Sequence, residues 1–164
     1  MAEQEVVQLS EEVIAGIEAA LAKFPPDQRR SAVMESLTLA QNANKGSLTV
    51  PIMDAIAKYL RIPAIAVYEV ASFYSMYELK PVGKHKICVC TNVSCMLCGS
   101  DGVVEHLKSK LGIGFGETTA DGKFTLKEVE CLAACGGAPM MQIGDDYHEN
   151  LTPERIDTIL ANLE

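Results

Sequence analysis

All six cysteines of the chain lie in two short segments, CVCTNVSCMLC (residues 88–98) and CLAACGG (residues 131–137). They are Cys88, Cys90, Cys95, Cys98, Cys131 and Cys135. This set is too dense for ordinary packing and too closely spaced for ordinary disulfides. Thiolates at such spacing bind iron or zinc, or form a redox pair with each other. The sequence therefore indicates metal or redox chemistry.

Three kinds of site fit part of the pattern. The spacing Cys90-x4-Cys95-x2-Cys98 matches the first three ligands of a plant-type ferredoxin. Cys95-Met-Leu-Cys98, at a predicted strand-to-helix turn, matches the motif of a thioredoxin-like thiol-disulfide protein. Cys95 and Cys98 together with Cys131 and Cys135 loosely resemble a tetrahedral zinc site.

The later pair, Cys131 and Cys135, bears on this choice. A plant-type site needs one late cysteine and a thioredoxin site needs none, whereas this chain supplies two. Gly136 and Gly137 follow directly and can take positive φ, which lets backbone N–H groups approach cluster sulfurs. A site that uses both late cysteines is therefore favoured.

The early ligands must then come from the first segment. In a strand, Cys88 and Cys90 point to the same side, and Cys88 lies one two-residue step deeper in the sheet. Cys90, at the strand end, is better placed to reach a cluster in a loop. The predicted ligand set of one 2Fe-2S cluster is therefore Cys90, Cys95, Cys131 and Cys135. Cys88 and Cys98 are interpreted as buried packing residues, because buried free cysteine behaves as a small hydrophobe.

The part of the chain before Lys80-Pro-Val-Gly83 contains no cysteine and has helical periodicity. Proline, glycine and capping residues divide it into four helices. These are a helix over residues 10–23, one capped by Asp27 with apolar Val33, Leu37 and Ala40, one that opens at Thr49–Pro51, and one after Pro63.

The fourth helical segment, AIAVYEVASFYSMY (residues 64–77), holds Tyr68, Phe73, Tyr74 and Tyr77. Its apolar stripe is wider than a single core-facing side requires. The simpler interpretation is a central helix buried on most sides. The alternative is that part of this surface meets another subunit, since aromatic residues and methionine concentrate at interface cores.

After Gly83 the pattern changes to a small α/β layer. Residues 85–90 and 123–131 are predicted strands, and residues 139–150 form a predicted hairpin. A helix over residues 100–112 is capped by Ser100 or Asp101 and stopped by Gly112, and Thr152-Pro153 opens a last helix. The whole chain is thus predicted to be α+β, with a helical domain over residues 1–82 and a second domain over residues 83–164.

Composition excludes several classes of function. With Lys+Arg 14 against Asp+Glu 22 the net charge is −8, which argues against nucleic-acid binding and a polybasic membrane anchor. The N-terminal MAEQEVVQLSEE lacks the features of a signal peptide, and no apolar run is long enough to span a membrane. We therefore expect a cytoplasmic protein in a reducing compartment, where clustered cysteines usually serve metal or redox chemistry.

CTNVSCMLCGSDG (residues 90–102) and EVECLAACGGAPMMQIGDDYHENLT (residues 128–152) together resemble the thioredoxin-like 2Fe-2S ferredoxins. More narrowly, they resemble the family of E subunits of bacterial NADH:quinone oxidoreductase, respiratory complex I, and their mitochondrial equivalents. The resemblance includes residues 39–50 and 67–90 and covers most of the chain after about residue 30. Two positions depart from it, because Cys98 stands where the family often has a basic residue and Ala133 where it often has glycine.

The resemblance implies a thioredoxin-like fold for residues 83–164 and one 2Fe-2S cluster on Cys90, Cys95, Cys131 and Cys135. It also implies an electron-transfer subunit of the NADH-oxidising module that catalyses nothing alone. The implied partner is a flavin-bearing subunit that binds NADH and carries FMN and a 4Fe-4S cluster. The complex would lie peripheral to the inner membrane. Equivalent subunits serve soluble NAD-linked hydrogenases and formate dehydrogenases, which remain the alternative.

The potential of such a cluster depends on nearby charges and hydrogen bonds. Glu128 and Glu130 favour the oxidised cluster if their carboxylates face it, or they are simply solvated beside a strand. The N-terminus of the helix after Gly99 and the N–H groups near Gly136 favour the reduced cluster.

Overall fold

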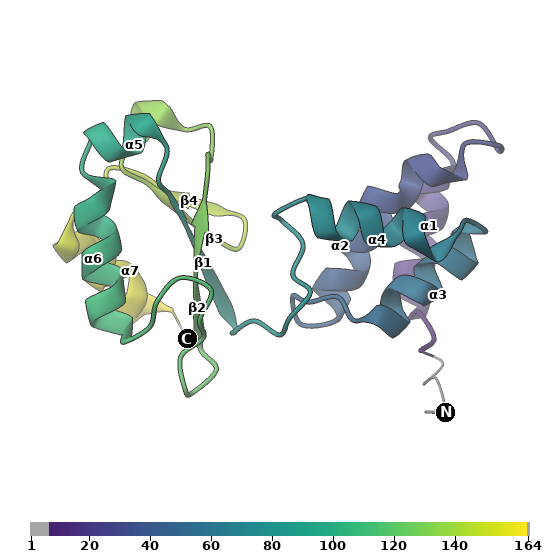
Figure 1. The fold of residues 1–164 in the computed structure, drawn as a ribbon, viewed down its shortest axis with the longest axis horizontal. Helices are drawn as coiled ribbons and strands as arrows, with labels where there is room; N and C mark the ends of the chain where they lie inside the picture. Colours follow the sequence, from purple (N-terminus) through teal and green to yellow (C-terminus); the bar gives the residue numbers. More distant parts are fainter. Residues whose placement is uncertain (1–6, 164) are drawn as a thin grey trace. The chain divides into compact units, whose positions relative to one another are not determined.

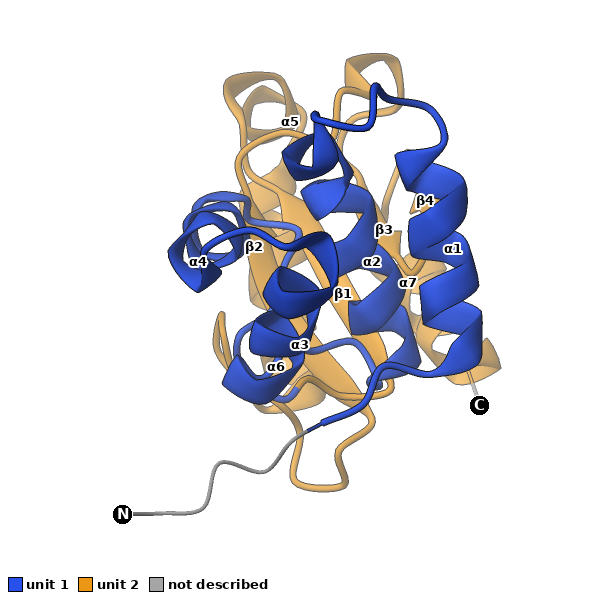
Figure 2. Ribbon diagram, turned by 90° about the vertical axis from the view of Figure 1, so that its right-hand side faces the viewer, with its two compact units in different colours: residues 1–81 blue, residues 82–164 orange. Residues whose placement is uncertain are grey.

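A computed structural model describes residues 7–163, and residues 1–6 and 164 lie outside the described part. The expectation that the N-terminus carries no targeting segment therefore falls partly outside the described residues. The chain divides into two compact units, residues 1–81 and 82–164 (Figure 2). Each unit has its own hydrophobic core.

The regular secondary structure of residues 7–81 is all helical (Figure 1). Ser10 caps its first helix by accepting a hydrogen bond from the Val13 N–H at 3.3 Å, and Pro51 lies in the first turn of α3, where its missing N–H costs nothing. The elements are α1 (Glu11–Leu21), the short 3-10 helix η1 (Arg29–Ala32), α2 (Val33–Ala43), α3 (Val50–Leu60) and α4 (Ala64–Phe73).

The helices of the first unit meet in a single apolar core. Its fully buried side chains include Ile17, Leu37, Ile56, Leu60 and Val67, which come from all four α-helices.

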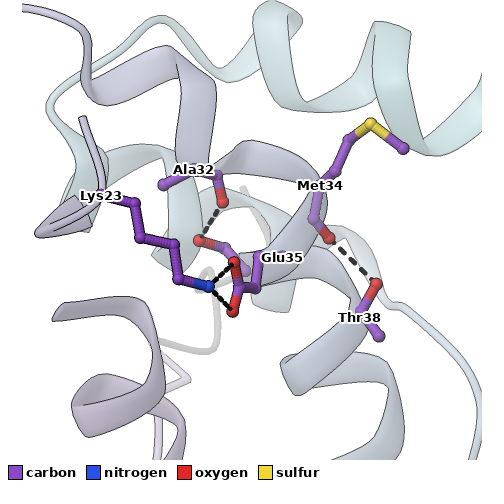
Figure 3. Close-up of polar contacts among 6 residues, drawn as sticks. Lys23, Ala32, Met34, Glu35 and Thr38 are labelled. Carbon is purple, nitrogen blue, oxygen red and sulfur yellow. Dashed lines mark hydrogen bonds and ion pairs between the residues drawn. The ribbon is translucent and has the colours of Figure 1, made fainter. Parts of the chain in front are cut away.

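Polar contacts around α2, some at its surface and one buried, add to this packing (Figure 3). Lys23 pairs with Glu35 at 3.0 Å. The Ser36 hydroxyl donates to the Ala32 carbonyl at 2.7 Å, and that of Thr38 donates to the Met34 carbonyl at 3.0 Å.

Two predictions for this unit are wrong. Asp27 does not cap a helix, because the chain first forms η1 and α2 starts only at Val33. The fourth helix is not a buried central helix: α4 ends at Phe73, whose side chain is 80% exposed, and buries only Ala66, Val67 and Ala71. Ala66, Val67 and Ala71 therefore form the buried side of α4, and Tyr68 packs against the core while it stays partly exposed.

The second unit has a mixed four-stranded sheet of order β2-β1-β3-β4. β1 and β2 are parallel, whereas β3 runs antiparallel to β1 and β4 antiparallel to β3. Its elements are β1 (His85–Cys90), α5 (Val93–Leu97), α6 (Ser100–Leu111), β2 (Phe124–Val129), the 3-10 helix η2 (Cys135–Gly137), β3 (Met141–Ile143), β4 (Asp146–His148) and α7 (Pro153–Asn162). The predicted α+β class is confirmed.

Helices α6 and α7 cover one face of this sheet (Figure 1). Leu107 of α6 and Ile156 of α7 are fully buried against Ile87 and Leu126 of the two parallel strands. Gly112 stops α6 at a φ of 69°, and Thr152 caps α7 by accepting from the Arg155 N–H at 3.3 Å, as the sequence predicts. No helix in the part of the chain described is both long and apolar enough to cross a bilayer.

Candidate iron-sulfur centre

The sheet brings the two cysteine segments together at one edge. Cys90 is the last residue of β1, and it pairs in parallel register with Val129, the last residue of β2. Parallel strands end at the same edge, so Cys131, two residues beyond β2, lies beside Cys90. β3 runs antiparallel to β1 with Met141 opposite Val89. The segment just before β3 therefore returns to this edge, and that segment includes Cys135.

Helix α5 supplies the fourth cysteine. The side chain of Asn92 caps this helix by accepting from the Val93 N–H at 2.8 Å. The cap sets the start of α5 immediately after β1 and turns Cys95 inward, where it is 2% exposed. Cys90 and Cys95 form a small buried cluster with Met140.

The sulfurs of the four predicted ligands lie close together. Cys90 Sγ lies within hydrogen-bonding reach of the thiols of both Cys95 and Cys131. Cys95 also interacts electrostatically with Cys135. The structure therefore brings the two pairs to one place, while ligation by these four residues stays a prediction.

Burial raises the pKa of both buried thiols, but hydrogen bonding outweighs it only at Cys90. Burial raises the pKa of Cys90, but hydrogen bonds from the N–H groups of Asn92 and Leu132, and then from the Cys95 and Cys131 thiols, outweigh it and lower the pKa. Burial, followed by the hydrogen bond and charge of Cys90, raises the pKa of Cys95 to about 11. Cys90 is thus the buried sulfur best prepared to carry negative charge.

Backbone N–H groups point at three of the four sulfurs. Asn92 and Leu132 donate to Cys90, Met140 donates to Cys95, and Ala133 donates to Cys131 Sγ at 3.3 Å. Such donors stabilise anionic sulfur, which is the state that a metal-bound thiolate takes. The donor set at this edge therefore fits a 2Fe-2S cluster.

A buried hydroxyl close in sequence to these cysteines also lacks a partner. Ser100, the first residue of α6, is fully buried, and its Oγ is the one buried side-chain nitrogen or oxygen among residues 7–163 without a hydrogen-bond partner. An unpaired buried hydroxyl costs about 1–3 kcal/mol, so its partner is usually a water or a bound group.

A single metal ion fits this edge less well. Within the described residues, no three His, Cys, Asp or Glu side chains are close enough to hold one ion. A zinc site on Cys95, Cys98, Cys131 and Cys135 requires such a group. A 2Fe-2S centre does not, because each iron takes two protein thiolates and shares the bridging sulfides. The geometry therefore gives no support to the zinc alternative.

The thioredoxin alternative also lacks support. A redox-active cysteine is partly exposed and has a lowered pKa, whereas Cys95 is buried with a pKa raised to about 11. Cys98 is exposed at the C-terminal end of α5, so the prediction that it is a buried packing residue is wrong. Cys88 is buried, as predicted.

The predicted role of the glycines after Cys135 needs correction. Neither Gly136 nor Gly137 takes a positive φ; the residue that does so in this segment is Ala133, at 58°. Gly137 instead allows a close approach, because a Cβ atom at this position would lie 2.6 Å from Cβ and Cγ of Glu149. Sequence reasoning missed Glu149. The adjacent glycines were the clue, because a glycine occurs where another part of the chain packs closely against the backbone as well as where φ is positive.

The segment after β4 pins the loop that carries Cys135. The Asn150 N–H donates to the Gly137 carbonyl at 2.7 Å, and the Leu151 N–H donates to the Pro139 carbonyl at 3.0 Å. The Ala138–Pro139 peptide bond between these two contacts is cis. Asn150 and Leu151 thereby hold the part of the loop that follows Cys135.

The surface around the four cysteines is part acidic and part apolar. Glu128 and Glu130 are exposed, and the Glu128 carboxylate accepts from the Thr91 hydroxyl at 2.9 Å. Both acids therefore match the solvated alternative. Helix α5 exposes Met96 and Leu97, at 46% and 78%, next to the segment with the exposed Cys131 and Cys135.

Comparison with known families identifies one match over most of the chain. The profile of the thioredoxin-like 2Fe-2S ferredoxins matches residues 17–164. The matched region includes all six cysteines as well as most of the helical unit.

Individual relatives agree with this match. The E subunit of the NADH-quinone oxidoreductase of Rickettsia bellii is 50% identical over 143 residues, which are 87% of this chain and 86% of that protein. The E 2 subunit of the NADH-quinone oxidoreductase of Rhizobium meliloti is 49% identical over 146 residues, 89% and 85% of the two chains.

A solved structure has a similar fold. A chain of an NAD+-reducing NiFe-hydrogenase in the air-oxidized state superposes with a TM-score of 0.67 at 21% identity. The match covers 77% of this chain but only 22% of the hydrogenase chain. At this identity the likeness concerns the fold alone.

Proposed function

The chain belongs to the thioredoxin-like 2Fe-2S ferredoxin family, and from this premise we propose that it is the electron-transfer subunit of an NADH:quinone oxidoreductase. The observation that carries the proposal is the meeting of two cysteine pairs at the edge where β1 and β2 end. Relatives about half identical over most of both chains are named as the E subunit of this enzyme.

Each part of the edge has a role in this proposal. Cys90, Cys95, Cys131 and Cys135 hold the two irons. When bound, a 2Fe-2S cluster with four thiolate ligands takes up and releases one electron and offers no open position to a substrate. The N–H groups of Asn92, Leu132, Ala133 and Met140 stabilise the sulfur charge, and the packing of Cys90 and Cys95 against Met140 excludes water.

No bond chemistry on a substrate follows from such a site, so the chain contributes to an oxidoreductase without catalysing a reaction alone. Its proposed partner is a flavin-bearing subunit that binds NADH and carries FMN and a 4Fe-4S cluster. The exposed Met96 and Leu97 beside the cysteines support a docking contact at this edge, because exposed apolar side chains gather at interfaces. We propose a cytoplasmic location, peripheral to the inner membrane through the complex.

One observation favours a different enzyme complex as the parent of this subunit. The fold likeness to the NAD+-reducing hydrogenase chain supports an equivalent subunit of a soluble NAD-linked enzyme. The two hosts differ in their other subunits: co-purification with proton-pumping membrane subunits supports the quinone reductase, and co-purification with a hydrogenase or formate dehydrogenase supports the alternative.

The cluster itself is tested on protein purified without oxygen. We expect about two irons and two sulfides per chain and a paramagnetic signal after reduction. Colourless, iron-free protein from a strictly anaerobic preparation would contradict the proposal. Zinc without visible absorption would restore the zinc alternative, and a dithiol that cycles with a reductant would restore the thioredoxin one.

A further inference from the structure

Glu149 packs its side chain against the loop of the proposed cluster. Its side chain occupies the space that a Cβ of Gly137 would fill, 2.6 Å from Cβ and Cγ of Glu149. The neighbouring Asn150 N–H donates to the Gly137 carbonyl at 2.7 Å. These contacts hold the carboxylate against the backbone two residues after Cys135.

The carboxylate of Glu149 is in a position to act electrostatically on this loop. Two residues of extended chain span at most about 7 Å, so the carboxylate lies on the order of 10 Å or less from the Cα of Cys135. That distance is comparable to the Debye length of about 8 Å at physiological ionic strength, and a partly buried charge is screened less than an exposed one. Glu149 is half-buried, and its carboxylate forms no ion pair among residues 7–163.

The other acids near this edge differ from Glu149 in their surroundings. Glu128 and Glu130 are exposed, and Glu128 accepts from Thr91. Water and salt therefore weaken their effect on the cysteine sulfurs more strongly.

We propose that Glu149 is a positioning residue whose fixed negative charge lowers the reduction potential of the cluster. This inference rests on the proposed function. Reduction adds one electron to the cluster, and a nearby carboxylate disfavours that added negative charge. Because the side chain fills the space over Gly137, its charge stays at a constant distance from the loop.

The test is a redox titration, followed by the paramagnetic signal of the reduced cluster, on the full chain with its cluster loaded. Glu149→Gln keeps the shape of the side chain and removes its charge. We expect its midpoint potential to move to a more positive value, with iron content equal to that of the wild type. Glu149→Met, also neutral and of similar length, provides the same measurement if the Gln protein loads poorly.

Two controls separate charge from packing and from net charge. Glu149→Asp retains the charge and is expected to keep the potential close to the wild-type value. Asp145→Asn removes an exposed acid of the same hairpin and is expected to shift the potential less than Glu149→Gln. An unchanged midpoint potential in the neutral Glu149 variants overturns the inference. A shift in Glu149→Asp or in Asp145→Asn as large as that in Glu149→Gln overturns it too. Wild-type protein without iron contradicts the proposed function instead, and so the two failures are distinguishable.

Discussion

At the scale of single residues, burial and hydrogen bonding separate the cysteines more clearly than their spacing in the sequence does. Cys90 and Cys95 are buried and receive N–H donors, Cys131 and Cys135 are exposed at the same edge, and Cys98 is exposed at the end of α5. N–H donors to sulfur prepare three of the four predicted ligands, Cys90, Cys95 and Cys131, to carry negative charge.

We therefore predict different outcomes for two serine substitutions. Cys131→Ser removes one of four thiolates, and we expect iron content to fall by at least half, with loss of the visible absorption. Cys98→Ser changes a side chain outside the set, and its iron content and colour are expected to match the wild type. Iron and sulfide analysis of anaerobic preparations checks both. Equal loss in the two proteins would show that the ligand set is wrong.

Much of the site follows from residue types, and the missed parts are tertiary. The strand end at Cys90 and the cap at Thr152 are local features that periodicity and capping rules predict. The exposure of Cys98 and the contact between Glu149 and Gly137 depend on how distant segments pack. The positive φ of Ala133 is the conformation that favours glycine.

At the scale of elements, the loop from Cys131 to Pro139 has little regular structure and depends on its neighbours. Asn150 and Leu151 hold it by backbone hydrogen bonds to Gly137 and Pro139, and η2 is a single turn. Small steric changes in this loop are therefore expected to reach the cysteines.

Adjacent glycines offer a matched pair of substitutions. Gly137→Ala places a methyl group against Glu149, and overpacking of this kind costs about 1–3 kcal/mol. Gly136→Ala meets no atom within 4 Å, so a change within about 0.5 kcal/mol is expected. Denaturant unfolding with parallel iron analysis measures both. Equal stability in the two variants would argue against the close contact at position 137.

Helices α6 and α7 are joined by a small charged cluster. Asp157 lies 2.9 Å from the His106 ring and 3.2 Å from Lys110. The hydrogen bond with His106, followed by that with Lys110, lowers the pKa of Asp157. The folded state therefore favours the carboxylate, and this contribution to stability is present above the ordinary Asp pKa of about 3.9 and is lost as the pH falls through the lowered value.

For Asp157→Asn we accordingly expect a slightly lower unfolding temperature at pH 7 and a smaller difference from the wild type near pH 3. The effect is expected to be small because the pair is exposed and screened. Thermal unfolding across this pH range provides the measurement, with exposed Asp145→Asn as the control. A deficit that is larger at pH 3 than at pH 7 would contradict the sign.

At the scale of the whole molecule, the chain consists of two units with separate cores. The helical unit carries its exposed Phe73 and Met76 near the end of α4, and the sheet unit carries every cysteine. Sequence analysis predicts a boundary near residue 82 from the change of periodicity and the Pro-Val-Gly segment, both of which are local signals.

We predict that residues 82–164, produced alone, fold and bind iron. Units of about 80 residues are large enough to bury a core, although their stability is marginal. We expect the fragment of residues 82–164 to show the same visible absorption as the full chain. A second fragment, residues 1–81, is expected to show the circular dichroism spectrum of a helical protein. An unfolded, iron-free fragment beside an iron-loaded full chain would mean that the sheet unit depends on the helical one.

The parallel register of β1 with β2 has a consequence for biosynthesis. The early and late cysteines meet only after the chain has crossed over through α6 and returned, so a nascent polypeptide that ends before β2 has only two of the four predicted ligands, Cys90 and Cys95. If these four cysteines hold the cluster, the site is complete only after β2 and the loop with Cys131 and Cys135 have been synthesised. Stalled chains that stop before residue 129 are expected to capture no 2Fe-2S cluster.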